Sequence, residues 1–270
     1  SKKIASKILD DEQFWNIINY DQWVVFQSLS RIYIYNTKNE SFHIIAPKNG
    51  IWKTFKANNS IYFQSLYEGL FEVENGKSKL ISTETVLKNN KLANIFSIDE
   101  GLLIETQQNG FYKLIGNTLS KHSLSADAQL NNTSVYCSQI LADGNIALGT
   151  ISNGVFIISK DGSIKYHITQ SEGLSNNTCL SLFEDNDKNL WLGLDNGINC
   201  INLQSPVKSY SDDTGILGTI YTSRLYNGKL YIGTNQGLFY KPYESNEQFQ
   251  FINGTKGQVW SLFEYDGTLF

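Results

Sequence analysis

The sequence predicts an all-β protein built from repeated four-stranded antiparallel sheets, and three observations support this prediction. First, a block of the form apolar-x-apolar-Gly, then two or three residues, then Gly-apolar, recurs every 37 to 44 residues along the 270-residue chain. Second, apolar and polar residues alternate with a period of two, which is typical of half-buried strands. Third, Asn-Gly and Asp-Gly pairs separate the apolar runs and favour tight hairpin turns, because Gly readily adopts a positive φ.

The repeated block is better preserved toward the C-terminal half. Its clearest copies are LWLGLDNGI at 190–198, LYIGTNQGL at 230–238 and IALGTISNGV at 146–155. The copies at 102–111, 61–70 and 23–33 lack the first Gly, and in the copy at 23–33 Ile32 also replaces the second. A fixed period in this range indicates a repeat architecture.

Each repeat is expected to contain four strands. The first strand, as at 179–184 or 259–264, ends at a turn such as Asp143-Gly144, and the second strand is the block itself. The third strand follows the second Gly. The fourth is expected around 42–43, 80–81, 122, 166–167, 209–210 and 251–252. Four antiparallel strands in roughly 40 to 45 residues, repeated in this way, make the blades of a β-propeller.

We therefore expect the whole chain, 1–270, to be a single partial β-propeller. The expected repeats span approximately 14–50, 51–92, 93–134, 135–178, 179–219, 220–258 and 259–270. The seventh repeat stops at the start of its second strand. The prediction is thus a seven-bladed ring whose last blade is incomplete in this chain.

Two register positions of the block carry apolar or aromatic residues in every repeat, and we expect them to pack successive sheets together. One position is occupied by Val25, Tyr62, Leu103, Ala147, Trp191 and Tyr231, and the other by Tyr33, Leu70, Phe111, Val155, Ile198 and Leu238. Burying one large apolar side chain contributes about 1.5–3 kcal/mol. Layers of such residues would therefore be the main stabilising contribution to the fold.

Composition argues against several classes of function. The net charge is −4, from 22 Lys and Arg against 26 Asp and Glu, and the basic residues are scattered. Because a surface that follows phosphates needs clustered Lys and Arg, we expect no binding of nucleic acid by this segment. No apolar run approaches the length of about 18 residues needed to cross a membrane. Cys137, Cys179 and Cys200 form no CxxC motif, so we interpret them as small buried residues, with one disulfide and a free thiol as the alternative.

The sequence predicts no catalytic residue, cofactor or metal site. His43, His122 and His167 fall on the outer strands of three different repeats, so they cannot converge on one metal ion. The segment 185–189 resembles the start of a calcium loop, but the central Gly and the later Glu are missing, and a hairpin turn is the better interpretation. The glycines lie at strand ends with no helix behind them, so they offer no phosphate loop.

Residues 172–198, EGLSNNTCLSLFEDNDKNLWLGLDNGI, resemble the two-component-regulator propeller repeat, and 230–238 is a second strong match. The other repeats match by register and not by identity. In that family the propeller is a sensor module outside the inner membrane of Gram-negative bacteria. A small β-sandwich, a membrane helix and an output region follow it, and the output is a hybrid histidine kinase or a helix-turn-helix region.

The resemblance implies a periplasmic sensor propeller within an inner-membrane-anchored regulator of transcription or signal transduction. It implies a ligand derived from carbohydrate, such as an oligosaccharide. The implied partners are the neighbouring β-sandwich domain of the same chain and a second copy in a homodimer. The segment itself is expected not to be an enzyme, although the full-length protein could carry histidine kinase activity.

The candidate residues for contact with a ligand or partner are those just before the second Gly of each block. They are Glu68, Asn109, Asn153, Asn196 and Gln236. All five are expected in turns between second and third strands, which open onto one face of a propeller. The alternative interpretation is that these residues are selected only for the backbone geometry of the turn.

Two other function classes stay open. Propellers also support lyases and hydrolases, and acids such as Glu184 and Asp185 at the ends of first strands could form a pair for glycosidic cleavage. An enzyme should carry a lone His, Arg and acid trio in one repeat, and the sequence shows none. The third class is a scaffold that binds proteins without any small ligand.

Overall fold

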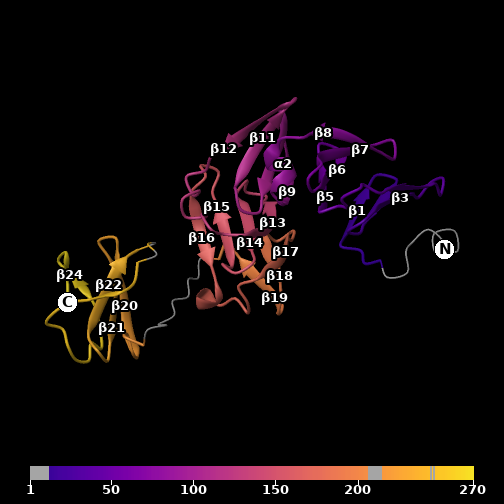
Figure 1. The fold of residues 1–270 in the computed structure, drawn as a ribbon. Helices are drawn as coiled ribbons and strands as arrows, with labels where there is room; N and C mark the ends of the chain where they lie inside the picture. The colour runs from indigo at the N-terminus through magenta and orange to yellow at the C-terminus, as the bar shows by residue number, and fades with distance from the viewer. Residues whose placement is uncertain (1–11, 206–214, 244, 246) are drawn as a thin grey trace. The chain divides into compact units, whose positions relative to one another are not determined.

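The computed structural model describes residues 12–205, 215–243, 245 and 247–270 (Figure 1). Within this part of the chain, the regular secondary structure consists of strands, together with a short helix, α2 (Thr85–Asn89), and a 3-10 turn, η1 (Gln170–Glu172). The all-β prediction is therefore confirmed. The chain divides into two compact units, one ending at Pro206 and the other beginning at Val207.

The first unit contains five successive antiparallel sheets, each an up-and-down meander. The first sheet contains β1 (Asn16–Tyr20), β2 (Trp23–Gln27), β3 (Ile32–Asn36) and β4 (Phe42–Ile45), and the second contains β5 (Lys53–Ala57), β6 (Ser60–Ser65), β7 (Gly69–Glu74) and β8 (Lys77–Ser82). The third contains β9 (Leu92–Ile98), β10 (Gly101–Thr106), β11 (Phe111–Ile115) and β12 (Thr118–His122), and the fourth contains β13 (Val135–Ile140), β14 (Ile146–Thr150), β15 (Val155–Ile158) and β16 (Ile164–Ile168). The fifth sheet contains three strands, β17 (Cys179–Glu184), β18 (Asn189–Leu194) and β19 (Gly197–Asn202). The fourth strand expected at 209–210 lies outside the described residues.

The second unit contains one four-stranded sheet and one hairpin. The sheet is formed by β20 (Ile220–Tyr226), β21 (Lys229–Thr234), β22 (Leu238–Pro242) and β23 (Gln250–Phe251), and the hairpin by β24 (Glu264–Tyr265) and β25 (Thr268–Leu269). The first strand expected at 259–264 is wrong in extent. The strand observed there, β24, begins only at Glu264, and both of its residues pair with the two-residue strand β25. A seven-bladed ring, and a single propeller over 1–270, stay predictions.

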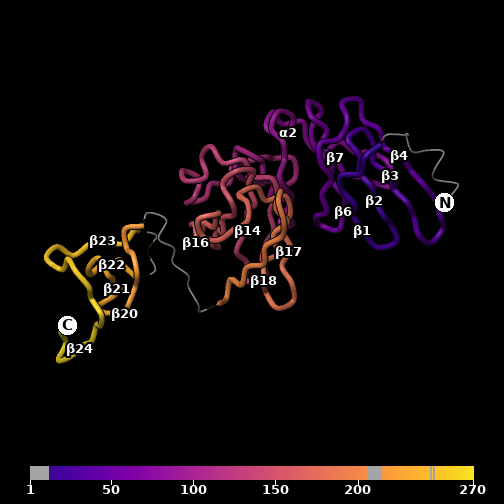
Figure 2. The backbone as a smooth tube through the Cα atoms, turned by 90° about the horizontal axis from the view of Figure 1, so that it is seen from below, coloured from indigo at the N-terminus to yellow at the C-terminus, as the bar shows by residue number. Residues whose placement is uncertain are grey.

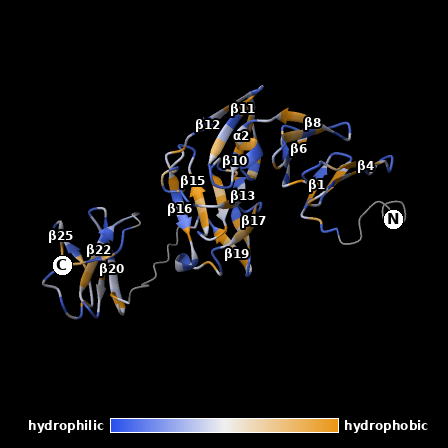
Figure 3. Cartoon of the chain, viewed as in Figure 1, coloured by the Kyte–Doolittle hydropathy of each residue, from blue (hydrophilic) through white to orange (hydrophobic). Residues whose placement is uncertain are grey.

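Successive sheets of the first unit pack face to face through apolar clusters, and each central strand contributes to both of its neighbours. In β10, Leu102 and Ile104 join the cluster shared with the second sheet, while Leu103 joins the cluster shared with the fourth. In β14, Ala147 and Leu148 divide in the same way. Figure 2 shows β14 beside β17 of the next sheet, and Figure 3 shows the hydrophobic colour of the wholly buried β15. Because successive side chains of a strand point to opposite faces, the period-two alternation of the sequence lets each central strand pack against two neighbouring sheets.

The predicted packing layers are confirmed in the first four sheets and wrong in the fifth. The buried members are Val25, Tyr62, Leu103, Ala147, Tyr33, Leu70, Phe111 and Val155. Trp191 and Ile198, however, are 42% and 70% exposed. They lie on the face of the fifth sheet opposite to Leu190 and Leu192, which pack on the fourth sheet, and this sheet is the last of its unit. In the second unit, Tyr231 and Leu238 are half-buried.

Candidate functional site

The first Gly of the block allows side chains to cross the second strand at close range. Gly149 pairs with Cys137 of β13, and a Cβ at Gly149 would lie 2.6 Å from the Cys137 Sγ and 2.8 Å from the Sγ of Cys179 in the next sheet. At Gly233 the corresponding neighbours are Thr222 Cγ2 at 2.6 Å and Val259 Cγ1 at 2.7 Å. All four distances are too short for a real Cβ, so the block requires Gly where these side chains pass.

In the first three sheets this position is occupied by a buried polar side chain instead of Gly. The three residues are Gln27, Gln64 and Glu105, and none is more than 1% exposed. Gln64 Nε2 donates to the carbonyls of Leu87 and Asn90, both at 2.7 Å, and its Oε1 accepts from the Leu92 amide at 2.9 Å. The absent Gly is therefore replaced here by hydrogen bonds that hold the chain leading into the next sheet.

Sequence reasoning treated these three copies as degraded and missed this role. The signal was present, because the Gly position is held by a long polar residue in all three copies. A buried amide needs partners, and the partners lie on the following sheet. The substitution pattern alone therefore indicated contact between sheets, but not the identity of the contacting groups.

Glu105 differs from the two glutamines because the fold satisfies only one of its oxygens. Its Oε2 accepts a hydrogen bond from the Ser138 hydroxyl of β13. Its Oε1 is buried and has no hydrogen-bond partner among the described residues. Burial raises the pKa of the carboxyl to about 8, against the smaller lowering effects of the Ser138 hydrogen bond and the Lys53 charge. Near neutral pH the carboxyl is therefore mainly protonated.

Lys53 of β5 is the basic residue whose charge acts on the Glu105 carboxyl. Its Nζ donates to the carbonyls of Ala93 at 2.8 Å and Tyr136 at 3.2 Å, so one side chain spans from the second sheet to the third and fourth. Burial lowers its pKa, while the nearby Cys137 and Glu105 act in the opposite direction. Lys53 is thus held by the backbone and not by a direct ion pair with Glu105.

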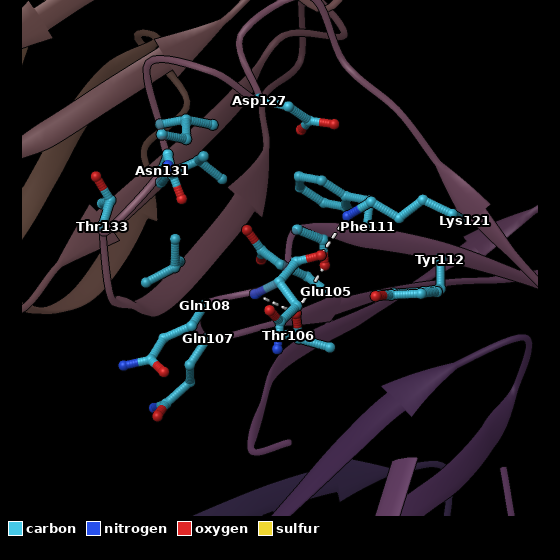
Figure 4. Close-up of a pocket in the computed structure, with 15 residues that line it drawn as sticks. Glu105, Thr106, Gln107, Gln108, Phe111, Tyr112, Lys121, Asp127, Asn131 and Thr133 are labelled. Carbon is cyan, nitrogen blue, oxygen red and sulfur yellow. Dashed lines mark hydrogen bonds between the residues drawn. The ribbon is translucent and has the colours of Figure 1, made fainter. Parts of the chain in front are cut away.

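A cavity of about 360 Å³ lies against Glu105, and Figure 4 shows its lining. The β10–β11 turn forms one wall and the β12–β13 connection forms another. The lining residues are Glu105, Thr106, Gln107, Gln108, Asn109, Gly110, Phe111, Tyr112, Lys121, Asp127, Leu130, Asn131, Thr133, Val135 and Leu148. The volume is near the lower end of the roughly 300–1,000 Å³ typical of small-molecule sites. Amides and hydroxyls together with aromatic and aliphatic carbon can bind a small polar molecule.

The walls of this cavity are fixed by the backbone. The backbone N–H of Gln107 donates to the Lys91 carbonyl at 2.8 Å, and the backbone carbonyl of Gln107 accepts from the Val135 N–H at 2.8 Å. The Asp127 Oδ2 accepts from the Leu124 amide at 3.1 Å, which closes the turn at the start of the second wall. Lys121 Nζ donates to the Asn109 carbonyl and lies 4.8 Å from the centre of the Tyr112 ring. The cavity is therefore largely preformed.

The five residues predicted at the turn before the second Gly do lie in turns between second and third strands, and among them Asn109 lines the cavity. The backbone N–H groups of Asn109, Asn153 and Gln236 donate to the hydroxyls of Thr106, Thr150 and Thr234 at 2.9, 2.8 and 3.0 Å. Glu68 accepts from the Asn49 amide at 2.9 Å, and Asn196 is exposed. These bonds favour the turn-geometry interpretation for the backbone and leave the role of the side chains a prediction.

The three histidines lie on β4, β12 and β16, in three different sheets. Within the described ranges, no group of three or more His, Cys, Asp or Glu side chains is placed to bind a metal ion. The same ranges contain no helix with the length and apolar character required to cross a membrane. All three cysteines are free thiols, with Cys179 buried, Cys137 half-buried and Cys200 exposed.

The segment 173–196 matches the model of the "Two component regulator propeller" family. It runs from the end of η1 through β17 and β18 into the following turn, so it includes the block with Gly193. This chain carries a two-component-regulator propeller repeat. The resemblance found in the sequence is thereby confirmed.

Solved structures similar to this chain share its fold at low sequence identity. One is the extracellular domain of a B. thetaiotaomicron protein described as a hybrid two-component system, with a TM-score of 0.59 and 16% identity over 95% of this chain and 38% of that one. Another is virginiamycin B lyase from Staphylococcus aureus, with a TM-score of 0.53 and 12% identity over 93% and 88% of the two chains. A third is the WD40 β-propeller domain of Doa1, with a TM-score of 0.52 and 11% identity over 94% and 86%.

These likenesses establish the propeller class of the fold. The chain spans 38% of the length of the B. thetaiotaomicron extracellular domains that it matches. A sequence search of curated proteins finds no match to the chain.

Proposed function

We propose that this chain is the extracytoplasmic sensor propeller of a membrane-anchored regulator and that it detects a ligand derived from carbohydrate. The observation that carries the proposal is the two-component-regulator propeller repeat at 173–196. The likeness to an extracellular domain of a protein described as a hybrid two-component system supports it. In this role the propeller contributes recognition, and the signal is generated elsewhere in the protein.

The cavity beside Glu105 supports a small ligand over a purely structural role. It is preformed, and its lining mixes side-chain amides with Phe111 and Tyr112. Sugars present hydroxyls that both donate and accept hydrogen bonds and carry apolar ring faces that stack on aromatic side chains. The lining therefore matches the chemistry of a saccharide.

The regulator is expected to be anchored in the inner membrane with this segment in the periplasm. We expect a β-sandwich domain of the same chain and a second copy of the protein to be its partners. A ligand can bias such a dimer only through different affinity for its two arrangements. The output is a hybrid two-component or a one-component system, and this segment is not itself an enzyme.

An enzyme of the lyase or hydrolase class is the second candidate, and the likeness to virginiamycin B lyase favours it. Such an enzyme would need an acid and a base converging on one bond. Incubating the chain with a panel of polysaccharides and measuring new chain ends tests this candidate. Newly formed ends that appear in proportion to the amount of protein would replace the sensor proposal.

The sensor proposal is tested by a thermal-shift screen of the chain against oligosaccharides of defined composition. A ligand at about one hundred times its dissociation constant stabilises the folded state by roughly 2.7 kcal/mol. We expect at least one oligosaccharide to raise the melting temperature without being cleaved. If none does, while a protein partner binds tightly, the chain is an interaction scaffold and the proposal is wrong.

A further inference from the structure

The Gly position of the third repeat combines two independent features. Glu105 has a buried Oε1 with no hydrogen-bond partner among the described residues, and the same residue lines the cavity of about 360 Å³. A buried polar atom without a partner destabilises the folded state. A fold that keeps such an atom at the edge of a cavity leaves one hydrogen bond for a molecule that enters it.

The equivalent residues in the neighbouring repeats show that this vacancy is specific to Glu105. Gln64 uses both polar atoms of its amide on Leu87, Asn90 and Leu92. Gln27 donates to the Ser28 carbonyl at 3.0 Å and accepts from the Thr54 hydroxyl at 3.5 Å. Those side chains use both of their polar groups in hydrogen bonds, whereas Glu105 uses only Oε2.

The charges around the cavity favour an uncharged ligand. The titratable and charged groups that face Glu105 are Lys53 from β5 and Cys137 from β13, with Asp127 and Lys121 on the rim of the cavity. Lys53 is committed to two backbone carbonyls, and Lys121 to the Asn109 carbonyl. An anionic ligand would find both lysines already donating to backbone carbonyls. A cationic ligand would find Glu105 protonated and Asp127 already accepting from the Leu124 amide.

The polar lining is rich in groups that both donate and accept hydrogen bonds. Gln107, Gln108 and Asn131 provide side-chain amides, and Thr133 provides a hydroxyl. Asn109 provides its amide oxygen, since its Nδ2 already donates to Asn90 Oδ1. A protonated carboxyl also donates from one oxygen and accepts at the other. Hydroxyl groups match this arrangement, because each of them can donate and accept in turn.

We propose that Glu105 is the recognition residue of a binding site for one neutral sugar residue, seated in the cavity between the β10–β11 turn and the β12–β13 connection. A ligand oxygen bonds Glu105 Oε1, and the amides of the turn bond the remaining hydroxyls. The proposal rests on the proposed function and adds to it the location of the site and the charge of the ligand. The group that the ligand contacts is a carboxylic acid at the position that Gly occupies in the better-preserved repeats.

The test measures binding by calorimetry and by NMR of the labelled chain, with glucose, galactose, mannose, N-acetylglucosamine and glucuronate as probes. Wild-type protein is compared with Glu105→Gln, Glu105→Ala and Thr118→Ala. Gln keeps a donor and an acceptor in the same shape, and Ala removes both. Thr118 is exposed on β12 and lies outside the cavity lining, so its variant controls for substitutions near the site.

We expect at least one neutral sugar to bind and glucuronate to bind at least tenfold more weakly. Glu105→Ala should weaken binding at least tenfold, while Glu105→Gln stays within about threefold of wild type and Thr118→Ala is unchanged. Circular dichroism of each variant confirms that it is folded. If Glu105→Ala does not fold, the NMR shift changes of the wild type on addition of sugar decide the test: they must include residues of the cavity lining, and changes confined to other residues would contradict the site.

Three results would overturn the inference. If a neutral sugar binds the wild type and Glu105→Ala equally well, this site is wrong although the sensor proposal stands. If glucuronate binds more tightly than every neutral sugar, the assigned charge of the ligand is wrong. If no saccharide of any length binds the wild type, both this inference and the proposed function fail.

Discussion

Glu105 shows how one residue can combine structural cost with a chemical role. Its carboxyl has a pKa of about 8 in the folded protein because burial disfavours the charge, against an ordinary value of 4.5. Between these two pH values the folded chain holds a proton that the unfolded chain has released. The free energy of unfolding must therefore fall as pH rises through this window, and it levels off above the folded-state pKa.

This linkage gives a prediction for Glu105→Gln. Since each pKa unit corresponds to about 1.4 kcal/mol, wild type should lose of order 3–6 kcal/mol of stability between pH 4.5 and 9 from this residue. The Gln variant should not show this loss. The measurement is urea unfolding of both proteins at several pH values. Groups other than Lys53 and Cys137, whose pKa values Glu105 influences, titrate equally in both proteins. The difference between the two curves therefore reports Glu105 together with its effect on these two neighbours, and parallel curves would contradict the prediction.

At the scale of elements, the spacing of neighbouring sheets depends on side chains of the first strands, which approach closely to the first Gly of a second strand. Gly149 lies under the sulfurs of Cys137 and Cys179, which come from β13 and β17. Those strands belong to neighbouring sheets, so this single position controls how closely the fourth and fifth sheets approach. The apolar cluster that they share includes Ala147, Val155 and Leu192.

We therefore expect Gly149→Ala to destabilise the first unit. The new Cβ would meet sulfur atoms at 2.6 and 2.8 Å, and overpacking of this kind costs about 1–3 kcal/mol. The matched control is Gly149→Ala in a Cys137→Ala, Cys179→Ala background, where the obstructing sulfurs are gone. Chemical denaturation should show a much smaller cost there. An equal cost in both backgrounds would mean that the close contact is not the cause.

At the scale of the whole molecule, the two units differ in the size of their cores. In the described residues, each of the four apolar clusters of the first unit contains between seven and ten buried side chains. The apolar cluster of the second unit contains three, namely Leu217, Ile232 and Phe239. Repeat architectures gain stability from each interface between neighbours. The second unit is therefore expected to be the less stable part of the chain.

Hydrogen exchange monitored by mass spectrometry tests this expectation. Amides of β21 and β22 should exchange through openings of lower free energy than amides of β10 and β14, because fewer buried contacts oppose local unfolding. A control run in mild denaturant should bring the two sets closer together as global unfolding begins to dominate. Equal protection in water would show that the second unit gains stabilising contacts beyond its own core.

The sequence by itself determined the strands, their order and most of their turns. Alternation of period two and the Asn-Gly and Asp-Gly pairs are local properties, since they depend on side-chain direction and on positive φ at Gly or Asn. Asn227 and Gly228, for example, have φ values of 48° and 70° at the predicted hairpin. The match to the two-component-regulator repeat also depended only on a contiguous segment.

Only the tertiary structure decided what the substituted Gly positions do and where a ligand could enter. Glu105 meets Ser138 across 33 residues and Lys53 meets Tyr136 across 83, and both contacts join different sheets. The exposure of Trp191 likewise depends on which sheet faces it, and not on its place in the repeat. A periodic sequence fixes which side of a strand each residue occupies, but partners on another sheet are set by how the sheets stack. For that reason the unpaired oxygen and its cavity could not be read from the repeat.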